Sequence, residues 1–488
     1  MQISVDQAMQ LAIQQHQAGR FAEAEQLYRQ VLAERPEYGD ALHLLGTLAA
    51  QQGHFDAAVE LIGRAVKANP KIAVYRSNLG NALREMGKPK EAIAEYLEVL
   101  RLDPKAAKDY ANFAAAFRES GNIDGALKAC RRGIKLTPKL AELHHEMGLA
   151  LLEQGDLDGA IASLRRAVAI NPQWPSPHWN LSIALLLKGD YRQGWIEHEW
   201  RLQMKEFEAS RPPVDKPKWD GEDLKGRRVL LTPEQSFGDV IQFIRYVPLI
   251  QDRGGHAVIV RQPALQRLLE GIPGLKQLDV ATADSFDLYC PLCSLPLAFA
   301  TRVKSIPADI PYLLPDADLV EALSAKLDAS RAKLKVGVAW TAPPSPKHDT
   351  SRSISLADLA PLNGIDGVEF YALQNRPTAP LNSPAPDGLT LLDPPVEWQD
   401  MADIGALISW MDLVICVDSA AAHMAGAMGK TVWLLLSTRP DWRWLPDRED
   451  NPWYPTMRIF RQKAAGDWAE VVDRVAKALA EHVKAQAL

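Results

Sequence analysis

The stretch NLGNALREMGKPKEAIAEYLEVLRLDP, residues 78–104, contains three residues that recur along the first two hundred residues of the chain. Gly87, Ala92 and Pro104 each belong to a column in which the same or a similar residue returns every 34 residues. The columns are Gly19, Gly53, Gly87, Gly121, Gly155 and Gly189; Ala24, Ala58, Ala92, Ala126, Ala160 and Gly194; and Pro36, Pro70, Pro104, Pro138 and Pro172. Three columns in phase predict a repeat architecture.

The three columns have a physical interpretation as a repeated helix pair. Glycine ends the first helix, where a residue with positive φ is often needed. The small residue lets the second helix approach the first, and proline ends the second helix. One pair cannot bury its apolar face alone, so neighbours stack into an α-solenoid. The pattern resembles the tetratricopeptide repeat, with about six units over residues 1–205, and predicts a protein-binding surface.

Asparagine recurs at one place in the first helix of three repeats, as Asn78, Asn112 and Asn180. In tetratricopeptide superhelices this place faces the concave groove, where amides can hydrogen-bond the main chain of a bound peptide. The alternative is that asparagine is simply tolerated on an exposed face. The sixth repeat departs from the pattern at Trp195 and Arg201, and we expect it to pack against the next domain.

Residues 206–225 are rich in proline and charge and predict a linker. Beyond them, β-rich runs alternate with helical stretches: RRVLLT, HAVIV, KVGVAW, VEFYAL, DLVICV and TVWLLL. This alternation predicts parallel sheets with crossover helices. Two groups, 226–320 and 333–488, predict two Rossmann-like halves with ligands beyond the carboxyl ends of the strands.

Composition narrows the class of protein. A net charge of −6 does not suggest a nucleic-acid binder. No basic and apolar leader and no uncharged apolar run of about 18 residues are found, so a cytoplasmic protein without a membrane span is expected. Cys290 and Cys293 form a C-x-x-C without a second ligand pair, which favours a structural role over zinc.

Polar residues follow three of the predicted strands. The first group lies in VLLTPEQSFGDVIQFIRY, residues 229–246, and the third in DSAAAHMAGAMGK, residues 418–430. Asp418 and Ser419 stand at the start of a helix with little side-chain bulk, which is a phosphate-binding arrangement. Lys347 and Arg352, after the second strand, could supply positive charge to the same anion. The alternative is that they lie in a solvated loop.

The 418–430 stretch resembles the nucleotide-sugar motif of the family-9 glycosyltransferases, the heptosyltransferases, and SFGDVIQF resembles their glycine-aspartate loop. Together with the repeats, EQSFGDVIQFIRYVPL, CPLCSLPLAF, DWRWLPDREDNPWYPTMRIFRQ and GDW resemble bacterial tetratricopeptide-repeat glycosyltransferases. These are grouped with O-linked N-acetylglucosamine transferases and include flagellin glycosyltransferases. The resemblance implies an α/β GT-B fold, a nucleotide-sugar donor on the C-terminal half, no cofactor and no obligatory metal. It also implies a last helix, about 466–486, that crosses back onto the first half.

The resemblance implies roles for several residues, and each has a structural alternative. Asp239 would be the general base, but S-x-x-D is also a capping box. Asp418 would contact the donor sugar or be a plain N-cap. His423 could contact a phosphate or be a buried, hydrogen-bonded histidine. Gln374 is expected near the base or ribose of the donor.

The predicted function is therefore transfer of a sugar from a nucleotide sugar to a Ser or Thr hydroxyl of a protein, flagellin among the candidates, recruited by the repeats. A tetratricopeptide adaptor with a degenerate glycosyltransferase half is one alternative. A glycosyltransferase acting on a glycan or lipopolysaccharide is the other. The tryptophan-rich segment 441–455 suits a lid or a domain contact.

Overall fold

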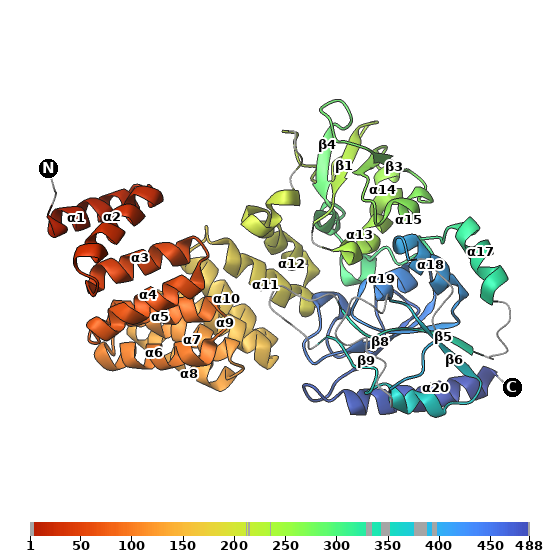
Figure 1. Ribbon diagram of the computed structural model, residues 1–488. Helices are drawn as coiled ribbons and strands as arrows, with labels where there is room; N and C mark the ends of the chain where they lie inside the picture. Colours follow the sequence, from red (N-terminus) through yellow and green to blue (C-terminus); the bar gives the residue numbers. More distant parts are fainter. Residues whose placement is uncertain are drawn as a thin grey trace. The chain divides into compact units, whose positions relative to one another are not determined.

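The computed structural model describes residues 4–210, 212, 215–234, 236–327, 334–342, 352–374, 388–392 and 398–486 (Figure 1). By its internal contacts the chain divides into two compact units, Met1–Leu181 and Ser182–Leu488. Each unit is described by itself. None of the helices in these ranges is both long and apolar enough to cross a membrane.

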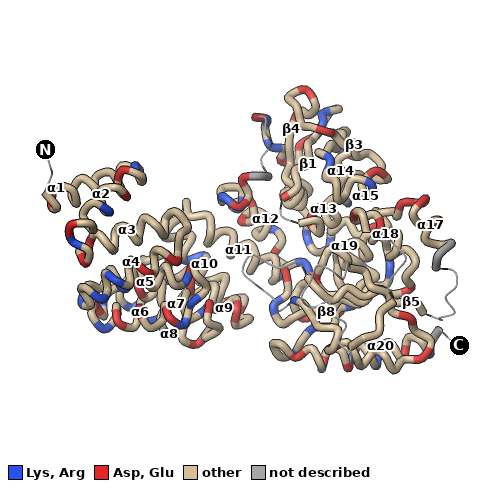
Figure 2. Tube along the Cα trace, viewed as in Figure 1, with Lys and Arg blue, Asp and Glu red and all other residues tan. Residues whose placement is uncertain are grey.

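The first unit is a solenoid of antiparallel helix pairs. Its helices are α1 (Val5–Gln17), α2 (Phe21–Glu34), α3 (Gly39–Gln51), α4 (Phe55–Ala68), α5 (Ala73–Glu85), α6 (Pro89–Leu102), α7 (Ala107–Glu119), α8 (Ile123–Leu136), α9 (Ala141–Gln154) and α10 (Leu157–Ile170). Helix α11 (Pro175–Leu187) begins in this unit and ends in the next. Charged residues of both signs are distributed along the repeats (Figure 2).

The three sequence columns have the structural roles predicted for them. All six glycines have positive φ, between 72° and 90°. The five alanines from Ala24 to Ala160 are completely buried, which allows the two helices of a pair to approach closely. The second helix of each of the first five pairs ends two residues before its proline. The predicted repeat solenoid is therefore confirmed.

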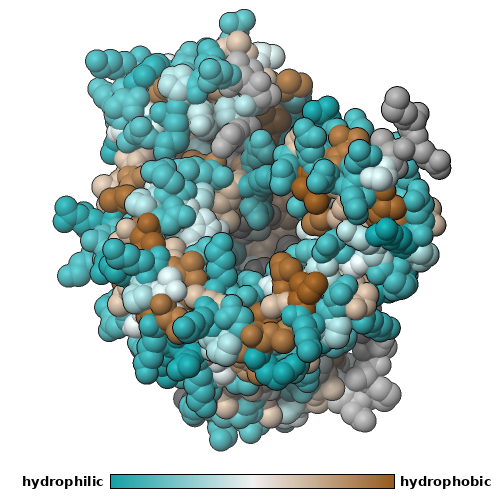
Figure 3. Space-filling view, turned by 90° about the vertical axis from the view of Figure 1, so that its left-hand side faces the viewer, coloured by the Kyte–Doolittle hydropathy of each residue, from teal (hydrophilic) through white to brown (hydrophobic). Residues whose placement is uncertain are grey.

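Few large apolar side chains of the first unit reach solvent. Val74 and Leu97 are about half exposed. In the view of Figure 3 hydrophilic residues predominate, and apolar ones form small separate patches. The repeats therefore offer a mostly polar surface.

The second unit holds two parallel sheets. The first has the order β3-β2-β1-β4 and the second the order β6-β5-β7-β8-β9. The strands are β1 (Arg228–Thr232), β2 (His256–Val260), β3 (Leu275–Leu278), β4 (Leu288–Pro291), β5 (Leu334–Ala339), β6 (Val368–Ala372), β7 (Leu413–Val417), β8 (Thr431–Leu436) and β9 (Met457–Arg461). Every neighbouring pair is parallel.

Helices connect and cover these sheets (Figure 1). They are α13 (Phe237–Phe243), α14 (Val247–Asp252), α15 (Gln266–Glu270), α16 (Leu295–Ala298), α17 (Ala317–Leu327), α18 (Met401–Trp410), α19 (Ala420–Ala427) and α20 (Trp468–Gln486). One apolar core joins side chains of both halves, including Val240 on α13 and Met424 on α19. The two sheets therefore form one packed body.

The expectation for the last helix is wrong. Helix α20 places Val471, Val475 and Leu479 in the core of the second sheet, against Trp433 and Phe460. Apolar residues at helical spacing along α20 match this sheet face, so the helix stays on its own half.

The sixth helix pair ends in the second unit. Helix α12 (Tyr191–His198) continues into a 3₁₀ helix, Glu199–Gln203. Trp195 Nε1 donates to Thr301 O at 3.1 Å, and the Trp195 ring meets Trp442 edge-on at 5.1 Å. The predicted packing of this repeat against the α/β part is confirmed, and segment 441–455 provides one side of the contact.

Candidate functional site

Strand order identifies one candidate edge in each sheet. In the second sheet β5 lies between β6 and β7, so the chain reverses direction across the sheet there. In the first sheet β1 lies in the same way between β2 and β4. Ligands of parallel sheets bind beyond the carboxyl ends of the strands at such switch points. The described polar residues that follow β1, β5 and β7, among them Asp239, Arg352 and Asp418, lie at these two places.

At the second switch point Asp418 follows β7 and Arg352 lies in the connection after β5. Arg352 Nη1 is 3.9 Å from Asp418 Oδ2. Burial, then the nearby Asp441, raises the pKa of Asp418 to about 6. Arg352 and a buried carboxylate with a raised pKa thus stand together at the start of α19.

The first residues of α19 have small side chains. Ser419 has the extended backbone of an N-cap, but its Oγ donates back to Val417 O at 3.1 Å and does not cap the helix. Alanines follow at the first three helical positions. The first N–H groups of a helix have no partner within it, and the helix dipole favours an anion there. This is a suitable end for binding a phosphate.

At the first switch point Asp239 has two kinds of partner. Its Oδ2 accepts from the Ser236 N–H at 3.1 Å and from the Ser236 hydroxyl at 3.0 Å, which completes a capping box at the start of α13. Its Oδ1 accepts from Arg443 Nη2. Burial raises the pKa of Asp239 above its usual range, while the arginine and the serine act in the opposite direction.

Arg443 comes from the second half and extends to the first. Its Nε donates to Gln242 Oε1 at 2.6 Å and its Nη1 to Asp441 Oδ1 at 2.8 Å. The guanidinium also lies 4.3 Å from the centre of the Trp442 ring. Nothing in the sequence pattern pointed to Arg443, because its partner Asp239 is 204 residues away.

Helices α13 and α19 touch at a glycine. A Cβ on Gly238 would stand 2.9 Å from His423 Cδ2 and 3.3 Å from His423 Nε2. His423 Nδ1 is 2.8 Å from the Tyr454 hydroxyl. Burial, with Arg443 and Arg245 nearby, lowers the pKa of His423 well below its usual value, so the imidazole is neutral. Glycine is therefore required for the two helix starts to meet.

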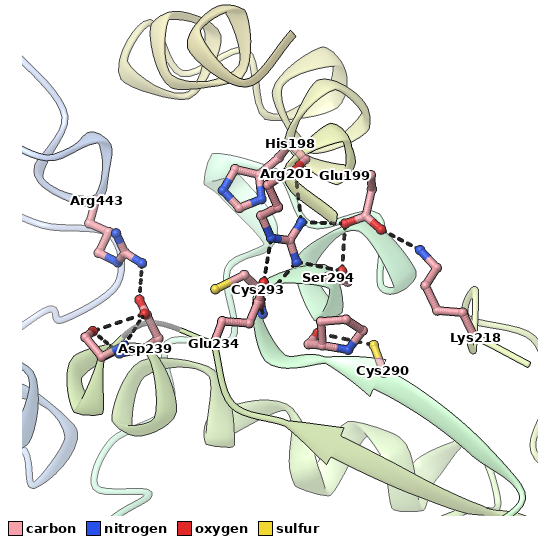
Figure 4. A network of polar contacts seen from close by, with 12 residues as sticks. His198, Glu199, Arg201, Lys218, Glu234, Asp239, Cys290, Cys293, Ser294 and Arg443 are labelled. Atoms are coloured by element: carbon pink, nitrogen blue, oxygen red, sulfur yellow. Dashed lines mark hydrogen bonds and ion pairs between the residues drawn. The ribbon is translucent and has the colours of Figure 1, made fainter. Parts of the chain in front are cut away.

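Glu234 lies in the loop between β1 and α13 and has a structural role there (Figure 4). Its carboxylate accepts from Arg201 Nε at 2.7 Å and Nη2 at 3.1 Å, and from the Cys293 N–H at 2.8 Å. Arg201 also donates to Glu199 and to Ser294. The Arg201 side chain is completely buried. Arg201 of the sixth repeat therefore joins the segments that follow β1 and β4 through Glu234 and Ser294.

Two other predicted donor residues have different outcomes. Gln374 Oε1 accepts from the N–H groups of Trp340 and Thr341 at 2.9 and 3.1 Å, and its Nε2 donates to Thr341 Oγ1 at 2.6 Å. Gln374 thus holds the backbone at the end of β5, and its contact with a donor stays a prediction. Lys347 lies outside the described residues.

Two of the three asparagines of the repeats, Asn78 and Asn180, pair with histidines. Asn78 Nδ2 lies 2.7 Å from His43 Nε2, and Asn180 Nδ2 lies 2.9 Å from His145 Nε2. Burial lowers the pKa of His145 to about 4, so this ring is neutral and accepts. Asn112 is half-buried. The peptide-binding role of these amides stays a prediction.

The four cysteines are not arranged as metal ligands in the part of the chain that the structure describes. All four cysteines are buried free thiols, and burial raises the pKa of Cys290 above its usual value. No cluster of three or more potential metal ligands occurs within the described ranges.

Comparison with known protein families supports the tetratricopeptide-repeat assignment of the first part of the chain. Tetratricopeptide-repeat families match residues 15–79, 73–106, 114–155 and 148–189. Protein FlbA of Caulobacter vibrioides is 25% identical over 320 residues, which cover 59% of this chain and 52% of that protein. The chain thus spans about half the length of this relative.

Solved structures are similar to the repeats. A MamA crystal structure is 22% identical with a TM-score of 0.32, covering 35% of this chain and 92% of that one. A tetratricopeptide protein of Thermus thermophilus is 21% identical with a TM-score of 0.32, covering 38% of this chain and 100% of that one. The type IV pilus biogenesis factor PilW is 15% identical with a TM-score of 0.38, covering 42% of this chain and 94% of that one.

Proposed function

We propose that the chain is a glycosyltransferase that moves a sugar from a nucleotide-sugar donor to a Ser or Thr hydroxyl of a protein recruited by the repeats. One observation carries the proposal. The start of α13, with Asp239, and the start of α19, with Asp418, meet at Gly238 and His423. A candidate base from one sheet is thus next to a candidate phosphate site from the other.

The proposed reaction assigns a task to each group. Asp239 takes the proton of the acceptor hydroxyl, whose oxygen bonds to the anomeric carbon. The bond from that carbon to the diphosphate breaks, and the nucleoside diphosphate leaves with the electron pair. The first turn of α19 and Arg352 stabilise the added negative charge. Asp418 orients the sugar.

The acceptor is proposed to be a protein because of the first unit. Repeats of this kind form extended binding surfaces, and more than a third of the chain is devoted to them. The resemblance of the motifs makes flagellin the first acceptor to test.

The proposal is tested by thermal unfolding with UDP-, GDP-, CMP-, ADP- and dTDP-linked sugars. A donor at about a hundred times its Kd adds roughly 2.7 kcal/mol to the folded state. We expect a rise of several degrees in Tm with one nucleotide class, and a smaller rise with the same donor for an Asp418→Ala variant. Unchanged Tm with every donor would contradict the proposal and favour an adaptor.

A further inference from the structure

The titratable groups around Asp239 come from four elements. They are Glu234 after β1, Cys293 after β4, His423 on α19, and Asp441 and Arg443 before and in the 3₁₀ helix Trp442–Trp444. His423 is neutral, and burial raises the pKa of the Cys293 thiol well above its usual value. Arg443 is therefore the only described cation in direct contact with Asp239.

The position of Arg443 is fixed on three sides. Gln242 and Asp441 accept from its Nε and Nη1, which leaves Nη2 directed at Asp239. Its flat face lies on Trp442, which meets Trp195 edge-on at 5.1 Å and Tyr191 at 6.4 Å. Trp442, packed against aromatic rings of α12, therefore supports the arginine.

We propose that Arg443 is the positioning residue of Asp239: it keeps the carboxylate ionised and turned toward the meeting point of α13 and α19. The inference rests on the proposed function for its catalytic meaning, but the ion pair can be tested without it. A base in a buried site works only if it is ionised before the acceptor arrives. Burial alone opposes this, and an opposite charge in contact favours it.

The first test needs no substrate. Wild type, Arg443→Gln, Asp239→Asn and the double variant are compared by thermal unfolding from pH 5 to pH 8. Burial already makes the folded state hold the Asp239 proton to higher pH than the unfolded state does, and loss of Arg443 raises the pKa of Asp239 further. The stability of the variant then falls more steeply than that of wild type as pH rises. We expect the loss in Tm caused by Arg443→Gln to be larger at pH 8 than at pH 5, and this difference to disappear in the Asp239→Asn background.

A loss in Tm that is equal at both pH values, or that persists unchanged with Asp239→Asn, would overturn the inference. Because no donor is involved, either result is independent of the proposed function. Conversely, failure of every donor to raise Tm would remove the proposed reaction and leave the ion pair intact.

The second test uses transfer with the donor that the panel finds. An opposite charge in contact lowers the pKa of a carboxyl by about 1–3 units, so Arg443→Gln should move the acid limb of kcat/KM upward by a similar interval. Arg443→Lys keeps the charge and should restore the wild-type limb. Arg267→Gln, which removes an arginine from another ion pair between the two halves, should leave it unmoved. An unmoved limb in Arg443→Gln, or an equal shift in Arg267→Gln, would overturn the inference.

Discussion

Two helix starts in the second unit are built alike and differ in what surrounds them. Asp239 and Asp403 are each the buried third residue of a capping box, formed with Ser236 and with Asp400. Each is also paired with an arginine of the opposite half, Arg443 for Asp239 and Arg267 for Asp403. Only Asp239 lies at a switch point beside α19. A capping box alone therefore does not indicate a catalytic residue. The position of Asp239 at the carboxyl ends of neighbouring strands distinguishes it from Asp403.

The largest effect is expected for the carboxylates themselves. Asp239→Asn should lower the rate of transfer by about 10²–10⁴, the usual contribution of a general base. Asp403→Asn changes a carboxylate of the same local design and should leave the rate per folded molecule near wild type. The measurement is initial rate with the donor found by the thermal panel. Equal losses in the two variants would reduce Asp239 to a helix cap.

Removing the buried arginine of the sixth repeat should be the largest stability effect. Arg201→Met leaves Glu234 buried without its cation, which costs about 3–5 kcal/mol. The comparison is Arg267→Met, whose arginine side chain is 28% exposed, so that water can replace part of the pairing. Denaturant unfolding should show the larger loss for Arg201→Met. The reverse order would mean that Glu234 is solvated in the folded protein.

A loss confined to donor binding is expected for Asp418→Ala. Hydrogen bonds to charged groups contribute about 1.5–3 kcal/mol, so the Kd of the donor should rise about 10- to 100-fold. Asp403→Ala is the control and should bind the donor as wild type does, as measured by calorimetry. Unchanged affinity in Asp418→Ala would remove this residue from the site.

The two helix starts also differ in the residue before each aspartate. Gly238 stands where the second capping box has Ala402. A methyl on Gly238 would press on His423, so Gly238→Ala should cost about 1–3 kcal/mol of stability. Ala402→Gly should cost only about 0.5–1 kcal/mol, the usual cost of glycine in a helix. Thermal unfolding of both variants measures the difference, and a harmless Gly238→Ala would show that the two helix starts can separate.

Much of the fold could be predicted because its signals are local. The repeat columns predicted the solenoid, and HAVIV and TVWLLL coincide with β2 and β8. Strand β4 was missed because it is only four residues long and ends in Pro291. Strand β9 was missed because it follows a tryptophan- and proline-rich segment without periodicity.

The site could be predicted only in part, because only some of its residues carry a local sequence signal. Asp239 and Asp418 follow recognisable strands, so their position at strand ends could be anticipated. Arg443 and Arg201 act through partners 204 and 33 residues away, and no spacing rule connects them. Arg201 was visible as a departure from the repeat, but its contact with Glu234 depends on how α12 packs.

The most direct measurement is a crystal structure of the protein with a non-hydrolysable nucleotide sugar. We predict that the diphosphate accepts hydrogen bonds of about 3 Å from the first N–H groups of α19, with the anomeric carbon facing Asp239. A diphosphate bound elsewhere in the second unit, or a sugar on the far side of α19 from Asp239, would contradict it.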